Sequence, residues 1–168
     1  MDDLNFSDME LVLMKDCWAK NEDDLLEIGS KVKLVFPFAD SENYQQTVGF
    51  QTQALRFVGI FSTVLNIISN SSTRQEQFHN VLDTLGKYHA KYTKNGLKEN
   101  HFILFKQAMM DVMGERFLYM ETSSNNMSAA GEAWKRLIIA VVDKIKNGFL
   151  AEINSEDELG STEYKIKL

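Results

Sequence analysis

Helical periodicity is the feature that most constrains how this chain can fold. Apolar residues recur every three or four positions over most of its 168 residues, a spacing that places them on one face of an α-helix. Pro37 is the only proline, so the residue that interrupts helices most strongly occurs at one position. Alternation typical of β-strands is scarce. The sequence therefore predicts one all-α domain of six or seven helices.

Local start and stop signals divide the chain into helices. Ser7 and Glu10 match the capping box, in which the serine hydroxyl and the glutamate carboxylate satisfy amides at a helix start. A second, shorter helix is expected to begin near Asp24, and Pro37 disfavours helix at the residue before it. Ser128 is expected to cap the final helix. The helices predicted after the proline span 47–69, 75–92, 99–117 and 128–151.

Length and composition fit a single domain. The chain is 44% apolar and 25% charged, which is ordinary for a globular protein. A chain of this size can bury roughly 70% of its unfolded surface, enough for a hydrophobic core without disulfide or metal cross-links. We expect the domain to occupy residues 1–152. Residues 153–168 have little apolar periodicity, so we expect a disordered tail there.

Charge and cysteine content narrow the classes of partner. The net charge is −6, whereas nucleic-acid binding favours a basic patch. No apolar run reaches the roughly 18 residues that span a membrane, and the acidic N-terminus lacks a secretory signal. Cys17 is the only cysteine and is expected to pack beside Trp18, which excludes internal disulfides. We therefore expect a cytoplasmic protein with neither nucleic acid nor membrane as a partner.

One histidine lies on the apolar face of the helix predicted at 75–92. His89 follows Phe78, Leu82 and Leu85 on this face. A histidine in such a position is more often a hydrogen-bonded core residue than a ligand, because buried polar groups usually find protein partners. The chain contains no zinc-protease, EF-hand or P-loop motif. The face alone therefore leaves the role of His89 open.

A series of segments in a fixed order resembles the globin family. The segments are CWAK, VFPF, FQTQALRFVGIF, LGKYHAKY, LKENHFILFKQAM and AAGEAWKRLIIAVVDKIKNGF. They are similar to neuroglobin-like, cytoglobin-like and invertebrate intracellular globins over about residues 7–152. The resemblance implies a globin-like helical fold around a pocket for haem b, in a binding protein and not an enzyme. It makes Trp18 and Trp134 structural core residues.

The resemblance also assigns the residues of the pocket. His89 matches the proximal ligand of the haem iron, a role suited to a neutral imidazole. Gln53 matches the distal position across the iron, and Phe57 matches the apolar residue that presses on the bound ligand. The other implied haem-binding positions are Phe36, Phe38, Arg56, Leu85, Leu97, Phe102 and Phe105.

Gln53 departs from the histidine that many family members carry at the distal position. A glutamine amide donates a hydrogen bond but is a poor iron ligand. The sequence therefore predicts ferrous haem with an open sixth position, where the amide would stabilise bound oxygen. Arg56, three residues further along the same helix, is interpreted equally as a partner of a haem propionate and as a solvent-exposed side chain.

The second departure lies between Gly29 and Phe36. Family members place the rest of the second helix and a short third helix there, and roughly three turns are missing from this chain. The implied fold is therefore a globin with a truncated second and third helix, and no residue is assigned to the wall that this segment supplies.

The implied function is reversible binding of a diatomic gas: oxygen, nitric oxide or carbon monoxide. The roles considered are oxygen transport or storage, sensing and redox signalling, and a homodimer is among the assemblies allowed. Two alternatives stay open. One is a haem-free or weakly haem-binding module for sensing or interaction. The other is a haem enzyme such as a nitrite reductase or a peroxidase.

Overall fold

The computed structural model describes residues 5–21, 27, 48–70, 73–120 and 126–166. No strand occurs in these ranges, and the all-α fold predicted from the sequence is confirmed. The elements of this part of the chain are α1 (Asp8–Lys20), α3 (Val48–Asn70), α4 (Arg74–Ala90), the 3-10 turn η3 (Thr93–Asn95), α5 (Glu99–Met120) and α6 (Asn126–Ile166).

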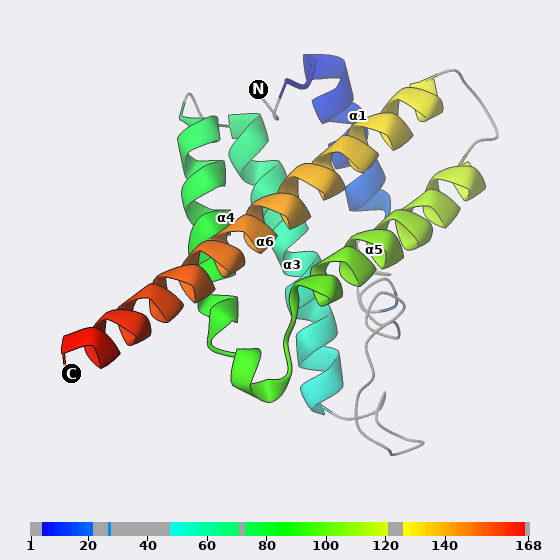
Figure 1. Ribbon diagram of the computed structural model, residues 1–168. Helices are drawn as coiled ribbons and strands as arrows, with labels where there is room; N and C mark the ends of the chain where they lie inside the picture. The colour runs from blue at the N-terminus through cyan, green and yellow to red at the C-terminus, as the bar shows by residue number, and fades with distance from the viewer. Residues whose placement is uncertain (1–4, 22–26, 28–47, 71–72, 121–125, 167–168) are drawn as a thin grey trace.

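Helix α6 organises the molecule. This helix runs across the molecule from end to end and passes over α4, while α3 lies beside α4 (Figure 1). Helices α5 and α1 also pack against α6, and α1 packs against α3. A helix that contacts three others fixes their relative positions, so a shift of α6 is transmitted to each of them.

The capping box predicted at the start of α1 is present. The Ser7 amide donates to Glu10 Oε2 at 2.8 Å, and the Glu10 amide donates to Ser7 Oγ at 3.3 Å. Further along the helix, Trp18 Nε1 donates to Ser62 Oγ at 2.8 Å and joins α1 to α3. The local signal therefore sets the start of the helix, and a buried ring fixes its packing.

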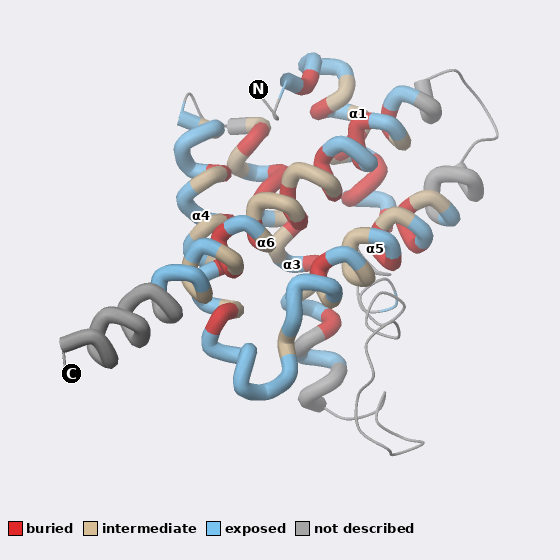
Figure 2. Tube along the Cα trace, in the orientation of Figure 1, coloured by how far each residue is buried: buried red, intermediate tan, exposed pale blue. Residues whose placement is uncertain are grey.

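The apolar faces predicted for the helices form the core (Figure 2). The ring of Trp18 lies 5.2 Å from that of Trp134 and 6.4 Å from that of Phe61, so three helices meet at one aromatic cluster. The inner face of α6 has the spacing of a helix and all of its members are buried: Trp134, Leu137, Ile138, Val141, Ile145 and Phe149.

The ends of α6 differ from the prediction. The helix begins at Asn126, so Ser128 lies inside it and the prediction that Ser128 caps it is wrong. At the other end the helix continues to Ile166 instead of ending near residue 151. A helix already formed gains one hydrogen bond for each residue added, and Ile153 still packs against the core. The division into a domain of residues 1–152 and a tail stays a prediction.

Part of the predicted pocket falls outside the described residues. Phe36, Phe38 and the shortened segment after Gly29 lie outside them. The helix expected near Asp24 also lies outside them, apart from Glu27, which is helical and exposed. Among the helices that the structure does describe, none combines the length and the apolar character needed to cross a membrane.

Candidate functional site

His89 lies in the last turn of α4 and is partly buried. Its Nδ1 atom lies 2.7 Å from the carbonyl oxygen of Leu85, one turn earlier in the same helix. A carbonyl oxygen can only accept a hydrogen bond, so Nδ1 carries the proton in this contact. In the neutral imidazole, Nε2 then keeps its lone pair. This is the tautomer that a histidine needs in order to bind a metal through Nε2.

Two aromatic rings hold the imidazole in place. The ring centre of His89 lies 5.9 Å from that of Phe102 and 6.4 Å from that of Tyr92, both in edge-on arrangements. Phe102 is itself buried and lies 4.9 Å from Phe149 of α6. The imidazole is therefore fixed by its own helix, by the start of α5 and, through Phe102, by α6.

A second aromatic contact joins α3 to α5. The rings of Phe57 and Phe105 lie 5.1 Å apart in an edge-on arrangement. Both side chains are partly buried. Gln53 lies in α3 one turn before Phe57, and its side chain is outside the described part of the chain. The structure thus pairs two of the predicted pocket residues across α3 and α5, and pairs His89 with Phe102 across α4 and α5.

The positive charge of Arg56 acts on a tyrosine just after α4. The pKa of Tyr92 is raised above its usual value, first because its hydroxyl donates to the Tyr88 hydroxyl at 3.2 Å, and the positive charge of Arg56 opposes this rise. Arg56 is exposed and lies three residues after Gln53, while Tyr92 lies three residues after His89. The charge of Arg56 therefore acts on Tyr92, in the turn that follows His89.

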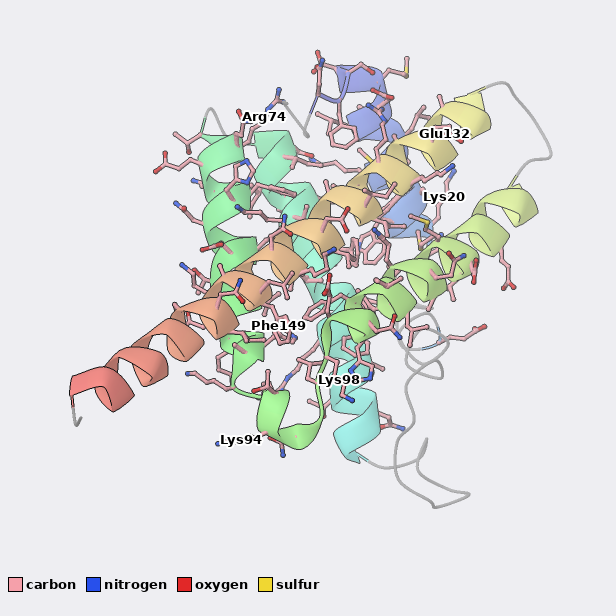
Figure 3. The ribbon with its side chains drawn as sticks, in the orientation of Figure 1. Lys20, Arg74, Lys94, Lys98, Glu132 and Phe149 are labelled. Atoms are coloured by element: carbon pink, nitrogen blue, oxygen red, sulfur yellow. The ribbon has the colours of Figure 1, made fainter. Side chains whose placement is uncertain are left out.

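The lysines around His89 lie on an exposed face. Lys87 Nζ lies 2.9 Å from Asp83 Oδ2, and Lys91 Nζ lies 5.0 Å from the centre of the Tyr88 ring. Figure 3 shows Lys94 and Lys98 at the turn between α4 and α5, and both are exposed. These contacts are those of a solvated surface.

The remaining predicted residues on α4 and beyond it line the same region. Leu85 and Leu97 are partly buried against the core, and the Leu97 amide donates to the Tyr92 carbonyl oxygen at 3.1 Å. The sequence prediction did not include Tyr92. The spacing of three residues between His89 and Tyr92, which places both on one helix face, is the signal that could have identified it.

Among the described residues, no group of three or more histidine, cysteine, aspartate or glutamate side chains could hold a metal ion. The described part of the chain is thus an all-α fold in which a partly buried histidine of α4 can present Nε2 to a ligand.

The globin family model matches residues 23–145, more than half of the chain. The chain belongs to the globin family. No curated protein matches the sequence, and the resemblance to the neuroglobin-like and cytoglobin-like branch stays a prediction.

The described residues fit the haem that the family implies. The Nδ1 hydrogen bond of His89 leaves Nε2 for iron. Four predicted pocket residues are apolar and only partly buried, in contrast to the fully buried side chains of the central core, so each still has apolar surface that a flat macrocycle can cover. They are Phe57, Leu85, Leu97 and Phe105.

Proposed function

We propose that this globin binds haem b through His89 Nε2 and uses it to bind a diatomic gas reversibly. The hydrogen bond from His89 Nδ1 to the Leu85 carbonyl carries the proposal, because it selects the tautomer that can ligate iron. A histidine that served only the core would gain from that bond equally. The imidazole of His89, however, also packs edge-on against the ring of Phe102, another predicted pocket residue.

Each remaining residue is given a role by its place. Leu85 orients the imidazole through its carbonyl oxygen, and Phe102 limits the rotation of the ring. Phe57 and Phe105 form an apolar wall that excludes water from the gas ligand. The bound haem supplies the ferrous iron that takes the gas.

Two polar residues of α3 complete the proposed site. Gln53 is proposed to donate a hydrogen bond from its amide to the gas ligand, and no side chain of the protein is proposed to bind iron on that side. Arg56 is proposed to pair with a haem propionate; its exposed side chain and the effect of its charge on Tyr92, three residues after His89, support this role. Oxygen, nitric oxide and carbon monoxide all fit this site, and the proposed roles are oxygen transport or storage, sensing and redox signalling.

Absorption spectra of the purified protein with added haem test the proposal. The expected result is a sharp Soret band, with one broad visible band after reduction without oxygen. His89→Ala should lose this spectrum. His79→Ala, which removes a partly buried histidine of the same helix, should keep it. A His89→Ala spectrum equal to that of the unchanged protein would refute the proximal role. If the unchanged protein itself gave the spectrum of unbound haem, the haem-free module would be favoured.

A further inference from the structure

Helices α4 and α6 approach each other at two glycines. A Cβ atom on Gly86 would lie 2.1 Å from the Ile145 carbonyl oxygen and 2.8 Å from the Phe149 amide nitrogen. A Cβ atom on Gly148 would lie 2.6 Å from the Asp83 carbonyl oxygen. These obstacles are backbone atoms, which cannot rotate away as a side chain can. The two helices therefore pack backbone against backbone where α6 passes over α4 (Figure 1).

The crossing lies one helical turn from His89. Gly86 precedes His89 by three residues and directly follows Leu85, whose carbonyl oxygen accepts the hydrogen bond from the imidazole. Any change in the separation of the helices at Gly86 therefore moves the acceptor of that bond. The contact with α6 therefore positions both His89 and the Leu85 carbonyl group that orients its imidazole.

A second connection leads from the same turn of α6 to the imidazole. Phe149 follows Gly148, and its ring lies 4.9 Å from that of Phe102, which in turn lies 5.9 Å from the ring of His89. Figure 3 labels Phe149 where α6 passes α4. The start of α5 is also held by α6, since Lys146 Nζ lies 3.5 Å from Glu99 Oε1. One turn of α6 thus positions the helix of His89 and the ring beside it.

We infer that Gly148 and Phe149 of α6 are positioning residues for His89, which set the height and tilt of its imidazole against the haem. The inference rests on the proposed haem ligation. The steric need for glycine is a property of this crossing, since Cβ atoms on Gly59 and Gly114 would meet nothing within 4 Å. A glycine pair that served packing alone would affect stability without affecting the iron–histidine bond.

The test compares Gly148→Ala with Gly114→Ala in the haem-loaded protein. The readouts are the iron–histidine stretching band in resonance Raman spectra of the reduced protein and the rate of haem transfer to an excess of a haem-free acceptor. Gly148→Ala should shift the band and speed haem loss about tenfold, as is typical when the support of a metal ligand is disturbed. Gly114→Ala should leave both readouts unchanged.

Phe149→Leu keeps the test decisive if Gly148→Ala does not fold, because it leaves the helix crossing intact and removes only the ring beside Phe102. Phe78→Leu, in α4 and equally buried, is its control. A shifted band in Phe149→Leu alone supports the inference. If Phe149→Leu and Phe78→Leu both lower the melting temperature and neither moves the band, the inference is overturned. Absence of the band in the unchanged protein overturns the haem proposal as well, so the two failures are distinguishable.

Discussion

The Nδ1 atom of His89 lies 2.7 Å from the carbonyl oxygen of Leu85, a backbone acceptor that no substitution of a side chain removes. The tautomer of the imidazole is therefore set by the helix itself. What can vary is whether the imidazole is present, how α6 places its helix, and what lies on the other side of the haem. These three variables give the predictions for the site.

Imidazole in solution should replace the missing ligand in His89→Ala. The substitution leaves a space next to Phe102, and a small planar base fits it. We expect haem to regain its Soret band when imidazole is added, with weaker retention than in the unchanged protein, because the added base is not attached to the helix. Titration of the variant with imidazole at constant haem measures this. A spectrum equal to that of imidazole and haem without protein would show that the added base does not occupy the space left by His89.

Substitution of Gln53 should change the coordination of the iron. Gln53→His supplies a nitrogen that can bind iron, so we expect split visible bands after reduction without oxygen. Gln53→Leu supplies neither ligand nor donor and should keep the single broad band. It should also release oxygen about fivefold faster, since one hydrogen bond contributes about 1 kcal/mol. Stopped-flow oxygen dissociation checks this, and equal rates would show that Gln53 does not contact the gas.

The apolar faces of the helices could be predicted from spacing alone, because each face has the period of a helix whatever it packs against. Phe61 and Leu137 are buried as their positions require. The crossing at Gly86 and Gly148 could not be predicted in this way. A single helix pattern does not specify which other backbone approaches a glycine, and that contact is set only when α4 and α6 meet.

The site could be predicted from the sequence only in part. Spacing placed His89 on an apolar face, but its role as a ligand came from the resemblance to globins. The contact of Phe57 with Phe105 depends on how α3 meets α5, which no local pattern specifies. The length of α6 was underestimated for a physical reason. Its polar continuation lacks proline and extends a helix that the core has already stabilised.

The capping box at the start of α1 should make stability depend on acid pH. Ser7→Ala removes the hydroxyl that accepts from the Glu10 amide and should cost about 1 kcal/mol of unfolding free energy. The pKa of Glu10 is lowered, first by the hydrogen bond from the Ser7 backbone amide, and the side chains of Ser7 and Arg136 also lower it.

A carboxyl with a lowered pKa stabilises the fold above its unfolded pKa, and this contribution is lost as pH falls through the folded pKa. Urea unfolding between pH 6 and pH 3 should show a loss of stability that is smaller in Glu10→Gln. Parallel curves for the two proteins would contradict the role of Glu10.

Cys17 should make stability depend on alkaline pH in the opposite sense. Burial raises the pKa of its thiol from 9.0 to about 11, against a smaller opposing effect of Lys20. Below the unfolded pKa the neutral thiol is equally protonated in both states and its contribution is complete. As pH rises from 9.0 towards about 11, the unfolded chain ionises first. The free energy of unfolding should then fall by up to about 1.4 kcal/mol per pH unit.

Cys17→Ala removes the titrating group and should show a flatter dependence over this range, despite a lower stability at neutral pH from the lost packing. Urea unfolding at several pH values from 8 to 10.5 measures the slope for both proteins. A thiol reagent should also modify Cys17 slowly in the folded state, since the buried neutral thiol is a poor nucleophile. Fast modification at pH 8 together with equal slopes would show that the thiol is accessible and ionises normally.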